Sequence, residues 1–103
     1  MGKKAFNGFT PSKKEMTAFC KRNHIVRMAL FGSVLRDDFG DDSDLDVLVE
    51  FAPGHVPGLA YFNIQQEMAR LFGRAVDLNT PGFLGRRIRD QVLREAVYIY
   101  DAS

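Results

Sequence analysis

Length, composition and charge place this chain among ordinary globular proteins. It has 103 residues, of which 46% are hydrophobic and 26% charged, and this is not the composition of a disordered chain. The net charge of +1 by itself implies neither a nucleic acid nor a membrane partner. The single cysteine, Cys20, excludes an internal disulfide and fits a cytoplasmic protein. No apolar run approaches membrane-spanning length, so we expect no membrane contact.

The order of helical and extended patterns predicts the fold class. Residues 1–9 are expected to form a flexible N-terminal arm and residues 10–103 a single domain. We expect the elements in this order: helix 10–23, strand 25–31, a short helix from Ser33, strand 44–51, helix 59–72, strand 74–80, helix 80–96, and a strand or extended tail at 97–100. This order predicts an α/β (α+β) fold, a small mixed sheet of about three strands flanked by about four helices.

Two alternatives are open for the start of the first helix. Thr10 can cap it with Pro11 at the first helical position, or Ser12 can form a capping box with Glu15. For the last helix, Thr80 followed by proline marks the start. Its apolar positions Leu84, Ile88 and Val92 form one stripe and are expected to face the core.

Two acidic residues interrupt an apolar strand pattern in the segment "SDLDVLVEF". Because side chains alternate along a strand, Asp44 and Asp46 are expected to point to the same side, roughly 7 Å apart along the backbone. Two carboxylates in this position repel each other unless a cation lies between them. Carboxylates in this number suit Mg²⁺. The alternative for Asp44 is a structural role in capping the adjacent "GDDS" turn.

A third acid, Asp77, lies in the next strand pattern, "RAVDLNT". Aspartate is disfavoured in an apolar strand, both by propensity and by burial. If this strand lies beside residues 44–51, Asp77 joins the other two carboxylates. Three carboxylates on neighbouring strands are enough to hold two Mg²⁺ ions, an arrangement that serves phosphoryl transfer.

The segment "FGS" is a candidate phosphate-binding turn. Gly32 lets the backbone approach a ligand closely, and Ser33 offers a hydroxyl at the start of the expected short helix. Arg36, on that helix, either contacts a triphosphate or pairs with Asp37 or Asp44, and the ion pair is slightly favoured.

These residues together resemble a known motif. Gly32-Ser33, Arg36 and Ser43-Asp44-Leu45-Asp46 are similar to the GSxxR…SDxD motif of the nucleotidyltransferase superfamily that includes polymerase β. The short chain looks like a minimal nucleotidyltransferase of the MNT type, the antitoxin partner of HEPN-domain toxins. The resemblance covers nearly the whole chain and includes the segment around Asp77.

The resemblance implies specific roles for these residues. Asp44, Asp46 and Asp77 would be both the catalytic residues and the ligands of two Mg²⁺ ions, with Asp77 also helping to deprotonate the acceptor. The nucleotide-binding set for ATP would be Gly32, Ser33, Arg36 and Ser43. The acceptor would be a tyrosine of a HEPN RNase toxin, with which the chain would form a hetero-oligomer.

Two other functions are open from the sequence. The chain could neutralise a toxin by binding alone, or it could transfer a nucleotide to a small molecule or an RNA end. Its basic C-terminal segment, residues 86–94, lacks the interleaved aromatic residues that stack on bases. A nucleic-acid partner is therefore not favoured.

Overall fold

The computed structural model describes residues 10–36, 39–40 and 42–102. The predicted flexible arm, residues 1–9, lies outside the described part. That residues 10–103 form one domain remains a prediction. Among the described residues, none of the helices combines the length and apolar character needed to cross a bilayer.

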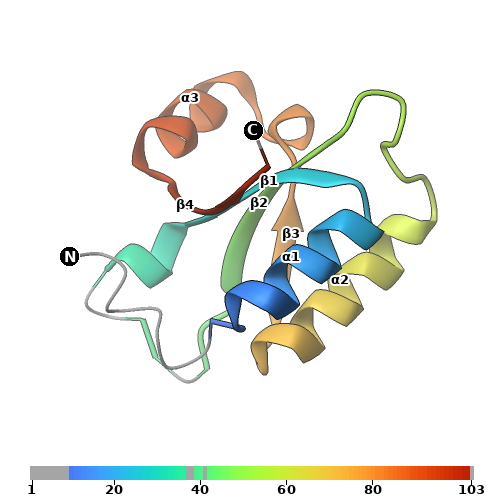
Figure 1. The fold of residues 1–103 in the computed structure, drawn as a ribbon. Helices are drawn as coiled ribbons and strands as arrows, with labels where there is room; N and C mark the ends of the chain where they lie inside the picture. Colours follow the sequence, from blue (N-terminus) through green and yellow to red (C-terminus); the bar gives the residue numbers. More distant parts are fainter. Residues whose placement is uncertain (1–9, 37–38, 41, 103) are drawn as a thin grey trace.

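A mixed sheet with strand order β3-β2-β1-β4 organises the described part of the chain (Figure 1). Its strands are β1 (Ile25–Phe31), β2 (Leu45–Phe51), β3 (Val76–Asn79) and β4 (Val97–Asp101). Strand β1 runs antiparallel to both β2 and β4, whereas β2 and β3 run parallel. The parallel pair needs a crossover, and helix α2 provides it.

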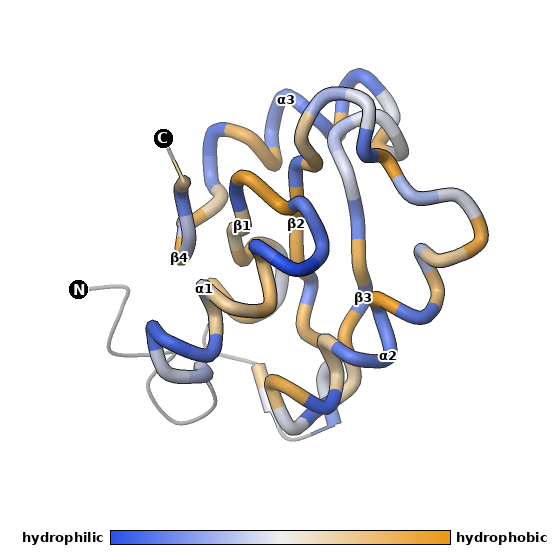
Figure 2. Tube along the Cα trace, turned by 45° about the vertical axis from the view of Figure 1, so that its right-hand side comes forward, coloured by the Kyte–Doolittle hydropathy of each residue, from blue (hydrophilic) through white to orange (hydrophobic). Residues whose placement is uncertain are grey.

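The helices cover both faces of this sheet. They are α1 (Lys13–Arg22), α2 (Ala60–Phe72) and α3 (Arg86–Glu95), with two short 3₁₀ helices, η2 (Gly32–Leu35) and η3 (Pro81–Phe83). Helices α1 and α2 lie side by side on one face, and α3 lies on the other (Figure 1). The helices alternate between hydrophilic and hydrophobic segments along the tube, while the central strand β2 is largely hydrophobic (Figure 2). This is the pattern of one central sheet covered by amphipathic helices.

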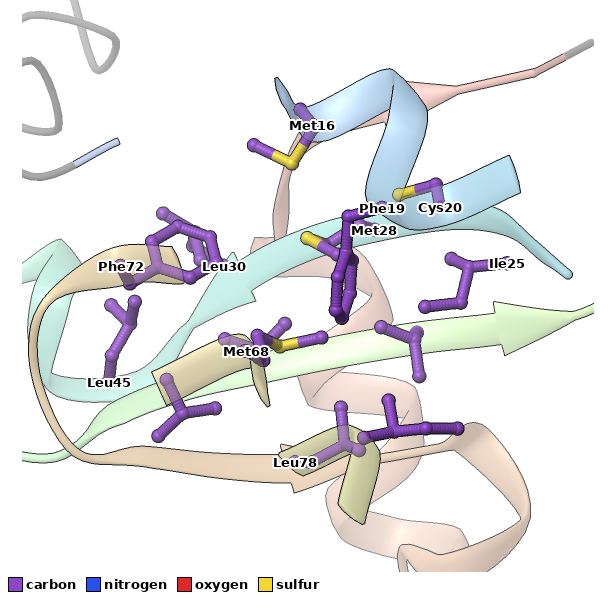
Figure 3. Close-up of a cluster of buried hydrophobic side chains, with 14 of the residues drawn as sticks. Met16, Phe19, Cys20, Ile25, Met28, Leu30, Leu45, Met68, Phe72 and Leu78 are labelled. Atoms are coloured by element: carbon purple, nitrogen blue, oxygen red, sulfur yellow. The ribbon is translucent and has the colours of Figure 1, made fainter. Parts of the chain in front are cut away.

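The larger core lies between the sheet and the α1/α2 pair (Figure 3). Its buried side chains include Met16, Phe19 and Cys20 from α1, Met28 and Leu30 from β1, Leu45 from β2, and Met68 and Phe72 from α2. Burial raises the pKa of the Cys20 thiol to about 12. The thiol is therefore a packing group and not a nucleophile.

A smaller cluster lies on the opposite face. Ala29, Leu48 and Val92 are buried there, and Phe31 and Leu84 pack against them. Because side chains alternate along a strand, Asp46 of β2 lies on this face with Leu48, while its neighbours Leu45 and Val47 enter the main core. The pleat of β2 thus separates the acidic side chain from the main core.

The fold class is confirmed, with corrections to individual elements. The fourth strand is the C-terminal segment, which pairs with β1 through Leu30↔Val97 and Met28↔Tyr100. The predicted helix over 80–96 begins only at Arg86, because Pro81–Phe83 forms a separate 3₁₀ turn and Gly85 is extended at the helix N-cap. Ile88 was predicted to face the core and is 58% exposed, so that prediction is wrong.

Helix α1 starts at the second of its two predicted positions. Ser12 is the N-cap: its hydroxyl accepts a hydrogen bond from the Glu15 amide at 3.1 Å, and the Glu15 carboxylate accepts one from the Ser12 amide at 3.2 Å. This reciprocal pair satisfies two amides that the first turn would leave without helical partners. Gly73 ends α2 in the left-handed conformation, with φ 72°.

The outer edge of β3 is covered by helix α2. The Gln65 side chain accepts a hydrogen bond from the Leu78 amide at 2.8 Å, and the Tyr61 hydroxyl donates one to the Leu78 carbonyl. Residues 61 and 65 lie one turn apart, so one helix face supplies both groups. These bonds satisfy backbone groups that an edge strand otherwise leaves open.

Replacing Gln65 by leucine is expected to lower the free energy of unfolding by about 1 kcal/mol, since the part-buried Leu78 amide loses its acceptor. The adjacent, exposed Gln66 provides the control, and Gln66→Leu should change stability by less than about 0.5 kcal/mol. Urea denaturation of the two variants measures this difference. Equal stabilities would contradict the assigned role of Gln65.

Candidate active site

The strand register brings two of the predicted acids side by side. Asp46 of β2 and Asp77 of β3 are directly paired residues of the parallel ladder, whose strands lie about 4.8 Å apart. The residues flanking Asp77, Val76 and Leu78, are buried in the α1/α2 core, so Asp77 points to the other face, where Asp46 also lies. The prediction that Asp77 meets the first acidic segment is thus confirmed for Asp46.

The environment of Asp46 is unfavourable for its negative charge. Burial raises the pKa of this carboxyl most, followed by the negative charge of Asp77. A hydrogen bond from the Ser33 amide acts in the opposite direction, while a hydrogen bond with Asp77 and the charge of Asp44 raise the pKa further. In the metal-free protein, the Asp46–Asp77 pair therefore holds a concentration of negative charge that a cation would relieve.

Gly32 lies directly against this carboxylate. Its φ is 77°, in the left-handed region that favours glycine. A Cβ built on Gly32 would collide with Oδ2 of Asp46 and would lie 3.1 Å from its Cγ. The turn Gly32–Ser33 therefore wraps around Asp46. The Gly32 backbone lies against the Asp46 carboxylate, and the Ser33 amide donates a hydrogen bond to it. A residue with a side chain fits at this position only if the Asp46 carboxylate moves.

The helix expected to start at Ser33 is shorter than predicted. It is the four-residue 3₁₀ helix η2, and Arg36 after it is extended. Arg36 is exposed, and among the described residues it forms no ion pair with Asp44; Asp37, its other predicted partner, lies outside the described part. A helix of one turn has little dipole, so η2 itself adds little to phosphate binding, and the groups available here are the Gly32–Ser33 turn and the exposed Arg36 side chain.

Ser43 performs a local structural task. Its hydroxyl accepts a hydrogen bond from the Gly40 amide at 3.1 Å, and its own amide donates to the Gly40 carbonyl at 3.1 Å. These two bonds close the turn that leads into β2. The contacts of Ser43 in the structure are thus those of a turn residue.

Asp44 directly precedes β2 and is exposed. Its charge contributes to the raised pKa of Asp46. Within residues 10–36, 39–40 and 42–102, no three His, Cys, Asp or Glu side chains are gathered closely enough to form a ready metal site. The arrangement is a close pair, Asp46 and Asp77, with Asp44 beside it.

The chemistry of this pair suits Mg²⁺. Magnesium in phosphoryl-transfer sites is commonly bound by one or two carboxylates and completed by substrate phosphates and water. Two hydrogen-bonded carboxyl groups with a raised pKa on Asp46 meet that requirement, because a divalent cation would offset their mutual repulsion. The donor set therefore fits a Mg²⁺ ion whose remaining ligands are water or phosphate oxygens.

Sequence reasoning missed Arg74, which holds the segment before Asp44. Its guanidinium donates to the carbonyls of Gly40 and Ser43, and lies 4.2 Å from the centre of the Phe39 ring. The only sequence signal is an arginine three residues before Asp77, at the start of a strand pattern. Its contacts lie more than 30 residues away in sequence, so local patterns do not reveal them.

Stability should depend on pH through Asp46. Because folding raises its pKa above the ordinary 3.8, the folded state favours the protonated acid. That stabilisation is fully present below pH 3.8 and is lost as the pH rises through the folded pKa. Asparagine imitates the protonated form, so metal-free Asp46→Asn should be more stable than the wild type at pH 7.

The measurement is urea denaturation of both proteins in EDTA at a series of pH values. The difference in free energy of unfolding between Asp46→Asn and the wild type should become smaller as the pH falls toward 3.8. A gap that widened on acidification would contradict the sign of this pKa shift. Adding Mg²⁺ at pH 7 should stabilise the wild type selectively, because the variant lacks one of the two paired carboxylates.

Comparison with known proteins decides the family. Residues 13–99 match the model of the nucleotidyltransferase domain. The chain belongs to this nucleotidyltransferase family. The predicted membership of an enzyme family that transfers nucleotidyl groups is therefore confirmed.

Individual relatives narrow the resemblance. This nucleotidyltransferase is 35% identical to the protein adenylyltransferase MntA of Thermococcus cleftensis over 87% of each chain. It is 38% identical to a solved structure described as a minimal nucleotidyltransferase, with a TM-score of 0.68, covering 82% of this chain and 85% of the other. The predicted resemblance to the MNT type is thus confirmed.

A more distant structure shares the fold. It is a chain from the complex of an MNT antitoxin with a tri-AMPylated HEPN toxin of Shewanella oneidensis. The TM-score is 0.62 at 19% identity, and the match covers 98% of this chain and 73% of the other.

Proposed function

We propose that this nucleotidyltransferase transfers AMP from ATP to a tyrosine hydroxyl of a HEPN-type toxin and thereby acts as its antitoxin in the cytoplasm. The observation that carries the proposal is the pairing of Asp46 and Asp77 across β2 and β3, with Gly32 against Asp46. The names of the relatives support the acceptor class, since one is a protein adenylyltransferase and another belongs to an antitoxin–toxin complex.

The proposed metal complement is two Mg²⁺ ions held by Asp44, Asp46 and Asp77. When bound, Mg²⁺ neutralises phosphate charge, which is the main catalytic requirement in phosphoryl transfer. Asp46 suits the central position because it is the most enclosed of the three acids and has a protein donor, the Ser33 amide, that orients it. Gly32 and Ser33 are proposed to lie along the β- and γ-phosphates.

The proposed reaction is an in-line displacement at the α-phosphorus of ATP. The tyrosine oxygen forms a bond to the α-phosphorus as the bond to the pyrophosphate oxygen breaks, and pyrophosphate leaves. Asp77 is exposed, so an acceptor from a partner protein can reach it. In this proposal Asp77 helps to take the tyrosine proton, because its side chain lies on the open side of the pair, where the acceptor hydroxyl can reach it. Arg36 and Ser43 remain proposed members of the nucleotide-binding set.

The experiment combines the purified chain, ATP, Mg²⁺ and a HEPN-type protein encoded beside its gene. Intact-mass spectrometry should show the HEPN protein gaining one or more AMP units, and peptide mapping should place them on tyrosine. A toxin that is neutralised without any gain in mass would indicate an antitoxin that acts by binding alone. Labelled AMP on an RNA or a small molecule, and none on protein, would indicate the remaining alternative.

A further inference from the structure

A second layer of contacts holds the acidic segment in place, and Arg74 is at its centre. The Arg74 Nη2 atom donates to the Gly40 carbonyl at 2.5 Å and to the Ser43 carbonyl at 2.9 Å. Its guanidinium carbon lies 4.2 Å from the centroid of the Phe39 ring. One planar cation thus grips both ends of the turn that precedes β2 and stacks on an aromatic ring beside it.

The hydrogen bonds of Arg74 fix the peptide next to Asp44. The Ser43 carbonyl belongs to the peptide group that joins Ser43 to Asp44, so Arg74 fixes that peptide directly. On the other side of Asp44, the Leu45 amide donates to the Ala75 carbonyl at 2.9 Å. The backbone of Asp44 is therefore fastened on both sides to the two residues that lead into β3.

Arg74 and Ala75 directly precede β3, the strand that contains the third acid, Asp77. Asp77 follows Arg74 by three residues and pairs with Asp46 in the sheet. Arg74 thereby connects the two chain segments that supply all three carboxylates. The side chain of Asp44 is exposed, so its position depends on this anchored backbone more than on packing around the carboxylate.

We propose that Arg74 is a positioning residue of the active site, which fixes the 43–44 peptide so that Asp44 can share a divalent cation with Asp46 and Asp77. This inference rests on the proposed function only for the use of the cation. Lysine cannot replace Arg74 fully, because an ammonium group can donate to the two carbonyls but lacks the planar guanidinium that stacks on the Phe39 ring.

The first test is Mn²⁺ binding, followed by electron paramagnetic resonance of the free ion, with Mn²⁺ alone as the probe. For Arg74→Ala, the apparent Kd should rise about tenfold, as is typical when a group that orients a metal ligand is removed. The apparent Kd of Arg74→Lys for Mn²⁺ should lie between the values of Arg74→Ala and the wild type. The control is Arg70→Ala, an exposed arginine on α2, which should stay within about twofold of the wild type.

Hydrogen–deuterium exchange gives a readout that needs neither metal nor partner. Peptides covering residues 42–48 should exchange faster in Arg74→Ala and Arg74→Lys than in Arg70→Ala. If Arg74→Ala does not fold, as judged by circular dichroism, Arg74→Lys carries both tests. Unchanged Mn²⁺ affinity together with unchanged exchange would overturn the inference, as would a wild type that binds no Mn²⁺.

Activity separates this inference from the proposed function. With a HEPN partner, Arg74→Ala should need about tenfold more Mg²⁺ for half-maximal AMP transfer, whereas a partly unfolded enzyme would lose rate without this shift. A wild type that binds Mn²⁺ but adds no AMP would refute the proposed reaction and leave the role of Arg74 standing. If the wild type transfers AMP and Arg74→Ala needs no more Mg²⁺ than the wild type, the role of Arg74 is refuted and the proposed reaction stands.

Discussion

Asp46→Asn is expected to lower the rate of AMP transfer by about 10²–10³-fold or more. The amide has nearly the shape of the carboxylate and can still accept the hydrogen bond from the Ser33 amide. It lacks the negative charge and the second anionic oxygen that a Mg²⁺ ligand requires. The loss should therefore be chemical, with the fold retained.

The measurement is the initial rate of AMP addition to the HEPN partner, by intact-mass spectrometry, beside thermal melts of each enzyme. Asp90→Asn, an exposed acid on α3, is the matched control and should transfer at the wild-type rate. The melts should show Asp46→Asn folded and, without metal, at least as stable as the wild type. If Asp46→Asn modified the partner at the normal rate, the assignment of this carboxylate would be wrong.

Gly32→Ala is expected to damage both stability and activity. The backbone at Gly32 has φ 77°, where a Cβ costs about 1–2 kcal/mol. The new methyl group would also collide with the Asp46 carboxylate, so the acid must move. Displacement of a reacting group by about 1 Å can cost about 10²-fold in rate, and we expect a loss of that order.

Gly54 provides a control that separates these two effects. It has nearly the same backbone angle, φ 80°, but a Cβ there meets nothing within 4 Å. Gly54→Ala should therefore lose a similar amount of stability from backbone strain and keep its transfer rate. Urea denaturation and initial rates, measured where both variants are folded, give the comparison. Equal rates for the two variants would show that Gly32 does not position Asp46.

The sequence alone predicts much of the fold because its local signals agree with the packing. The strand over 25–31, the capping box at Ser12 and the helix end at Gly73 all depend on residues close together in the chain. The sequence could place Asp77 beside Asp46 because aspartate is disfavoured in an apolar strand, so its presence there indicates a functional role. The GSxxR…SDxD motif then indicated the nucleotidyltransferase family.

The remaining features depend on contacts between distant segments. The C-terminal segment becomes strand β4 only because the edge of β1 is free to pair with it. The helix after Thr80 starts late because two glycines and a proline favour a turn there. Arg74 contacts carbonyl groups, and backbone acceptors are present at every residue, so no sequence pattern identifies its partners.

The most direct test of the central claim is a crystal structure of the chain with Mn²⁺ and a non-hydrolysable ATP analogue, with data collected at the manganese absorption edge. We expect an anomalous peak in direct contact with carboxylate oxygens of both Asp46 and Asp77, with the triphosphate along the Gly32–Ser33 turn. A bound nucleotide with no manganese between these two side chains, or with manganese only at other acids, would contradict it.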